Sequence, residues 1–172
     1  MLFRSLLKSQ HGMRLEKANE IPKMVHKGVA RLKQMYNYNT GAWGWWQFEQ
    51  PDAWMTAYAL RGLVVAKQEG YEVPEAFLQQ AKEGAAKLLA SLPTNTPEAL
   101  SNRAMLLYSL TLAGEGERLD GERNKIDPAK LNTEALAYLA FADRARGKNI
   151  THLVNLDRKS TRLNSSHTVI SY

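Results

Sequence analysis

Apolar residues recur three and four positions apart along almost the whole chain, and this spacing limits the fold more than any other feature. No segment alternates apolar and polar residues in the way that a half-buried β-strand does. Short segments that contain Gly, Pro, Asn or Asp separate the runs with helical spacing, and these residue types favour turns. The sequence therefore predicts an all-α protein.

Five helices and the start of a sixth are expected from this spacing. They span residues 21–37, 52–69, 74–92, 97–114 and 128–147, and the sixth begins near residue 150. Asp52 and Thr96 are predicted N-caps, because short polar side chains accept hydrogen bonds from the free N–H groups of a first helical turn. Gly70 is expected to end the second helix in a left-handed conformation.

The segment between the fourth and fifth helices carries mostly charged residues. Residues 115–126 show no apolar period, so we expect them to form a solvated loop. The following pair, Asp127-Pro128, repeats the cap-plus-proline pattern of Thr96-Pro97 and predicts the start of the fifth helix.

The repeated unit of helix, short loop and helix is typical of helical-hairpin architectures, in which each unit buries its apolar face against its neighbours. A helical-repeat interaction scaffold is one protein class with this organisation. The sequence has neither the signature residues nor the strict period of tetratricopeptide or armadillo repeats.

Both ends of the chain resemble translated sequencing-library adapters, and we expect residues 1–5 and 157–172 to be non-native. Residues 6–156 are then the protein segment proper, cut from a longer reading frame. Setting the ends aside removes four basic residues and one acidic residue, which lowers the net charge from +6 to +3. Half of the basic character therefore lies in the ends, and no nucleic-acid partner is expected.

Composition excludes several kinds of site. The chain has no cysteine, so it forms no disulfide, no Cys-based metal site and no thiol nucleophile of its own. His26 and His152 have no partner at metal-ligand spacing, and we expect no metal and no cofactor. No run approaches the roughly 20 apolar residues that span a bilayer, so no membrane contact by this segment is expected.

The region Lys23–Val73 resembles bacterial α-2-macroglobulins just after their thioester motif. Three segments carry the resemblance in the family's order, namely GAWGWW, PDAWMTAY and LVVAKQEGYEV. The turn Gly41-Ala42-Trp43, with Gln34 before it, is also similar to the α/α toroids that include terpenoid cyclases and protein prenyltransferases.

The resemblance implies a partial α/α toroid, an arc of an incomplete ring taken from a thioester domain. In thioester-bearing members a Cys-x-x-Gln pair forms an internal thioester, which captures an attacking protease covalently. That pair would precede Leu6, so this segment would be neither an enzyme nor an inhibitor by itself. The implied parent is a broad-spectrum endopeptidase inhibitor of the periplasm or cell envelope, and its partners would be target proteases.

The candidate site is a group of aromatic residues. They lie in the segment between the first two predicted helices and in the first turns of the second helix. The members of the group are Trp43, Trp45, Trp46, Phe48, Trp54 and Tyr58. The resemblance suggests that they shield the thioester from water, whereas ordinary packing suggests that they anchor the loop to the helices. A surface on which sugars or isoprenoids stack is a third interpretation.

An enzyme with a toroid fold, either carbohydrate-active or a terpenoid cyclase, is the alternative function. Glu49 and Asp52 could form the carboxylate pair of such an enzyme. Asp52 is explained better as the N-cap of the second helix, and the acid-rich DxDD motif of cyclases does not occur. No catalytic residue is therefore assigned.

Overall fold

The computed structural model describes residues 20–46 and 49–157, and this part of the chain is helical apart from its turns and loops. The main helices are α2 (Ile21–Met35), α3 (Ala53–Gln68), α4 (Glu75–Ser91), α5 (Pro97–Leu110), α6 (Asp120–Asn124) and α7 (Thr133–Ala145). A further helical segment covers residues 151–157. The predicted all-α class is confirmed. Residues 1–5 and 158–172 lie outside the described residues, so the adapter-like origin of both ends stays a prediction.

Local signals place three helix ends correctly. Asp52 caps α3, with its carboxylate accepting a hydrogen bond from the Met55 N–H at 2.7 Å. The Thr96 hydroxyl accepts from the Ala99 N–H at 3.2 Å and caps α5. Gly70 has a φ of 84° after the end of α3, as expected of a left-handed terminus.

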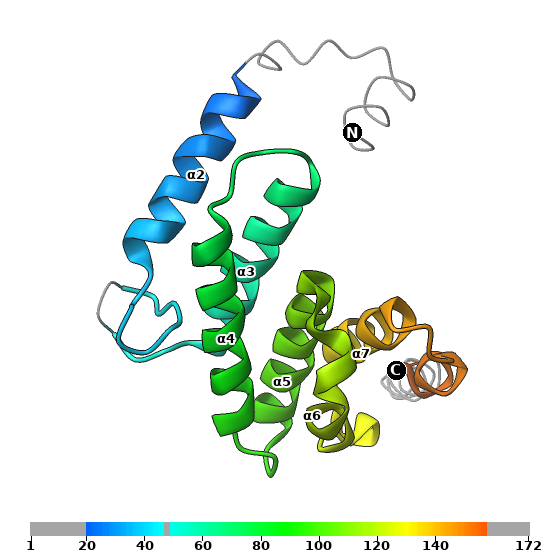
Figure 1. Cartoon of the computed structure of the whole chain (residues 1–172). Helices are drawn as coiled ribbons and strands as arrows, with labels where there is room; N and C mark the ends of the chain where they lie inside the picture. Colours follow the sequence, from blue (N-terminus) through cyan, green and yellow to red (C-terminus); the bar gives the residue numbers. More distant parts are fainter. Residues whose placement is uncertain (1–19, 47–48, 158–172) are drawn as a thin grey trace, which may run out of the picture.

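Three helices form a row through the middle of the molecule, because α3 packs against α5 and α5 packs against α7 (Figure 1). Helix α4 contacts both α3 and α5, while the short α6 contacts α5. Helix α2 contacts α3 only lightly and stands at one side. The row of α3, α5 and α7, with α4 and α6 packed against it, is the arrangement expected of an arc of a two-layered ring. Closure of that ring stays a prediction.

The apolar core lies between these helices. Its fully buried leucines include Leu60, Leu63, Leu89, Leu100, Leu107 and Leu139. Most of them lie on α3 and α5, which are apolar around much of their circumference. Helices of this kind are expected in the interior of a domain.

The prediction of a solvated loop over residues 115–126 is wrong. This segment forms a 3₁₀ turn (Gly116–Leu119) and then α6, with Leu119 and Ile126 buried in the core. Most of its charged residues are paired with other parts of the chain: Glu122 contacts Arg103, and Arg123 binds Asp143 at 2.8 Å. Glu115 pairs with Lys82 of α4, and Asp120 pairs with Arg146. These ion pairs and the two buried apolar residues hold the segment, and such contacts need no apolar period.

The predicted start of the fifth helix is also wrong. Asp127 caps only the single 3₁₀ turn Pro128–Lys130. Helix α7 is capped by Asn132, whose side-chain oxygen accepts from the Ala135 N–H at 2.8 Å. Asn132 therefore provides a second cap five residues after Asp127, and Pro128 starts only the 3₁₀ turn. The fourth helix, in contrast, ends near Gly114 as expected. A π-helical turn (Thr111–Glu115) continues α5, and Gly114 interrupts it with a φ of 88°.

Candidate functional site in the aromatic loop

Trp43 is the buried centre of the loop between α2 and α3. Its indole N–H donates to the Leu32 carbonyl at 2.8 Å, at the end of α2. Its backbone N–H donates to the Thr56 hydroxyl at 3.1 Å, and that hydroxyl donates to the Trp43 carbonyl at 3.0 Å. These bonds tie the loop to both helices, and the side chain of Trp43 is only 1% exposed.

Trp43 also joins a cluster of three rings with Tyr36 and Phe77. The ring centroids lie 4.8 Å apart for Tyr36–Trp43, 5.2 Å for Tyr36–Phe77 and 6.0 Å for Trp43–Phe77, all with edge-on geometry. The Tyr36 hydroxyl donates to the Gln80 carbonyl on α4 at 3.0 Å. Edge-on aromatic packing adds to the gain from burial, so this cluster fixes the loop against α4.

A contact between two glycines brings the loop close to α4. Gly41 has a φ of 74°, and its carbonyl oxygen would lie 1.5 Å from a Cβ atom built on Gly84. Helix α4 therefore has to carry glycine at this position. The sequence interpretation missed Gly84, although a glycine inside an otherwise regular helical pattern lowers helix stability and so draws attention to packing at that position.

Three other aromatic residues stack on the surface, and we call Trp45, Trp54 and Tyr58 the aromatic column. Trp45 and Trp54 have ring centroids 6.1 Å apart and planes within 2°, while Trp54 and Tyr58 lie 5.3 Å apart with planes within 5°. The Arg61 guanidinium lies 5.5 Å from the Tyr58 ring centre. The three column residues are 59%, 43% and 57% exposed, so about half of each residue's surface stays open to solvent in the described part of the chain.

The six candidate aromatic residues are thus divided. Trp43 is in the core, the aromatic column is exposed, and Trp46 is 71% exposed without a ring partner in the described chain. Phe48 lies outside the described residues. The loop joins core and column, because Trp43 is fixed only two residues before Trp45.

Among the residues that the structure describes, Glu49 and Asp52 do not form an acid–base pair, and no side chains are grouped to bind a metal ion. The Asp52 carboxylate is used as the cap of α3, and Glu49 is exposed. His26 and His152 are both exposed. The described residues contain no group of three His, Cys, Asp or Glu side chains suited to a metal ion. None of the described helices is long and apolar enough to cross a membrane.

Tyr36 should make the chain sensitive to alkaline pH. Burial raises the pKa of Tyr36 from 10.0 to about 12, with smaller contributions from Tyr38 and Glu83. A raised pKa means that the fold favours the protonated phenol, so its contribution is complete below pH 10.0 and is lost as pH rises toward about 12. We expect the free energy of unfolding to fall more steeply over this window in the natural chain than in Tyr36→Phe.

Urea unfolding of both proteins, followed by circular dichroism near neutral pH and again within the window, measures this difference. Tyr36→Phe should also lose about 1 kcal/mol near neutral pH, because the hydrogen bond to Gln80 is gone. Parallel loss of stability in the two proteins with rising pH would rule out Tyr36 as the titrating group.

Two curated proteins are similar to this chain. One is "Alpha-2-macroglobulin" of Thermotoga maritima, 27% identical over 172 residues, which cover 98% of this chain and 10% of that protein. The other is "Alpha-2-macroglobulin homolog" of Yersinia pestis, 37% identical over 90 residues, which cover 52% of this chain and 4% of that protein. The chain thus spans a tenth or less of the length of these relatives. No family model matches the chain, and no solved structure matches it.

Proposed function

Since the chain is related to the bacterial α-2-macroglobulins, we propose that it is a segment of a broad-spectrum endopeptidase inhibitor of that kind. In this proposal the segment is an arc of the α/α toroid of the thioester domain. It has no enzymatic activity, and it serves the protease trap as a structural part. The full-length inhibitor acts on proteases in the periplasm or at the cell envelope.

The aromatic column is the observation that carries the proposal. Large flat side chains seldom gather on a surface without a partner, because covering them is favourable. A thioester reacts with water and with amines, so it survives only where apolar groups exclude both. We propose that Trp45, Trp54 and Tyr58 cover such a group before the protease arrives, while Trp43 holds their loop in place.

The sulfur has to come from another part of the full-length inhibitor, because this chain contains no cysteine. The small share of the relatives that the chain spans leaves room for that part. The proposal therefore expects a Cys-x-x-Gln pair N-terminal to Met24 in the complete gene, together with β-rich domains on either side of the helices.

The test is protease capture by the product of the complete gene. Proteases of different specificity are mixed with the product, and covalent adducts are detected by denaturing electrophoresis under reducing conditions. We expect adducts with the natural protein and many fewer with the double variant Trp45→Ala, Trp54→Ala, because an uncovered thioester hydrolyses before it meets a protease. Free thiol measured before the addition of protease should rise in the same variant.

Phe141→Ala is the matched control, since Phe141 is 55% exposed on α7 but stands outside the aromatic column. It should capture proteases as the natural protein does. A complete gene that encodes only helices, or a full-length product that forms no adduct, would overturn the proposed inhibitor. If the double variant Trp45→Ala, Trp54→Ala and the control Phe141→Ala released equal amounts of free thiol, the proposed role of the aromatic column would be wrong, while the proposed inhibitor would stand.

A further inference from the structure

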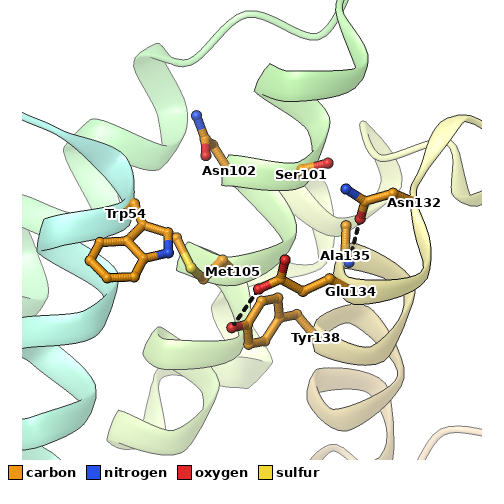
Figure 2. A pocket seen from close by; sticks show the side chains of 8 residues that line it. All are labelled: Trp54, Ser101, Asn102, Met105, Asn132, Glu134, Ala135 and Tyr138. Carbon is orange, nitrogen blue, oxygen red and sulfur yellow. Dashed lines mark hydrogen bonds between the residues drawn. The ribbon is translucent and has the colours of Figure 1, made fainter.

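A small pocket opens beside the aromatic column, between α3, α5 and α7. It has a volume of about 100 Å³, and Figure 2 shows its lining side chains. Trp54 comes from α3, Asn102 and Met105 come from α5, and Glu134 and Tyr138 come from α7. Met105 is buried and lies between Trp54 and Tyr138, so the floor is apolar and two aromatic rings flank it.

Polar groups with spare hydrogen-bonding capacity surround this apolar floor. The Asn102 side chain has no hydrogen-bond partner among the described residues, and the Asn132 side chain uses only its oxygen, in the cap of α7. The Tyr138 hydroxyl donates to one Glu134 oxygen at 3.2 Å, which leaves the other carboxylate oxygen without a bond among the described residues. Two amides, a carboxylate and a phenol thus face a ligand from different helices.

These groups identify the chemistry of a ligand. A phosphate is disfavoured, because Glu134 is the single charged side chain among the lining residues and it is negative. An entirely apolar ligand would make no use of the amides of Asn102 and Asn132, which line the pocket. A sugar ring satisfies both parts of the pocket, since its C–H face covers Met105 and an aromatic ring while its hydroxyls reach amide and carboxylate groups.

We propose that this pocket binds one pyranose ring of a neutral glycan. The pocket is smaller than the usual ligand cavity of several hundred Å³, so it holds one ring and the neighbouring rings lie outside. Trp54 is the middle ring of the aromatic column, and the column offers a surface for those neighbouring rings. Binding is therefore weak for a monosaccharide and stronger for an oligosaccharide. A glycan bound there and the group proposed above to lie under the column would exclude each other.

The test is titration of the ¹⁵N-labelled chain with cellotriose, maltotriose and chitotriose, followed by NMR chemical shifts of amides and indole N–H groups. At least one trisaccharide should shift the Trp54 indole signal and the Asn102 side-chain amide in a saturable way. Trp54→Ala and Asn102→Ala should each weaken that binding by about tenfold. Asn102→Ala leaves the aromatic rings in place, so it reports on the polar contact even where Trp54→Ala disturbs the fold.

Trp46→Ala is the matched control, because Trp46 is even more exposed than Trp54 but does not line the pocket. It should bind the trisaccharide with unchanged affinity. The proposal fails if no trisaccharide gives saturable shifts, or if Trp46→Ala weakens binding as much as Trp54→Ala. It also fails if Nα-acetyl-lysine amide saturates the pocket while the sugars do not, because Glu134 and the rings would then recognise a cation.

Discussion

Replacing Gly84 by alanine should lower the free energy of unfolding by about 3 kcal/mol, a large effect for one added methyl group. The new Cβ atom would lie 1.5 Å from the Gly41 oxygen and 2.4 Å from the Gly41 carbonyl carbon. Both atoms belong to the backbone, so no side chain can rotate away to make room. The loop cannot retreat without cost either, because the hydrogen bonds of Trp43 tie it to α2 and α3.

Urea unfolding of Gly84→Ala beside Gly62→Ala gives the comparison. Gly62 lies inside α3, and a Cβ atom there meets only the Leu32 side chain, at 4.0 Å. Alanine at position 62 should stabilise the chain by up to about 1 kcal/mol, because it favours the helix more than glycine does. Two variants of equal stability would show that the contact between Gly41 and Gly84 does not constrain the loop.

Replacing Arg103 by methionine should destabilise the chain by about 3–5 kcal/mol, the usual cost of breaking a buried ion pair from one side. Arg103 is 1% exposed. Its guanidinium donates to the Leu89 carbonyl at 2.9 Å and to the Leu92 carbonyl at 2.6 Å, at the end of α4. It also pairs with Glu122 of α6. Methionine fills a similar volume but leaves the carbonyls and the carboxylate without this partner.

Arg118→Met is the control for loss of an arginine as such. Arg118 pairs with Glu115 at 2.6 Å but is 56% exposed. Glu115 keeps a second partner, because Lys82 lies 3.3 Å from it. A pair with an exposed arginine contributes at most about 1 kcal/mol, so thermal or urea unfolding should hardly change. If Arg103→Met were no more harmful than Arg118→Met, the guanidinium of Arg103 would not be what holds α4 and α6 together.

The sequence alone established the local structure well. Asp52, Thr96 and Gly70 act within one helical turn, so the residue type at one position is enough to place a helix end. The same logic failed at Asp127, where the cap and the proline made one 3₁₀ turn and Asn132 began the helix. Both residues act as caps, and the residue types alone did not show which of them begins the long helix that packs on α5.

The sequence located the segment that contains the candidate site, but it did not distinguish the buried Trp43 from the exposed aromatic column. Composition marked Trp43, Trp45 and Trp54 as one group because they are neighbours in the sequence. The structure buries Trp43 and exposes the other two. Burial depends on what lies opposite each ring, and for Trp43 that is Phe77 of α4, a residue distant in the sequence. The α-2-macroglobulin relatives support the family interpretation without resolving this difference.

The sequence by itself determined that the chain is helical, where most of its helices begin and end, and that it carries no cysteine. Only the tertiary structure decided that Gly84 must be a glycine, that Arg103 is buried and that Trp54 stacks between Trp45 and Tyr58. The reason is physical. Caps and helical spacing act over a few residues of one segment, whereas close contacts, buried charges and exposed faces depend on which helices meet.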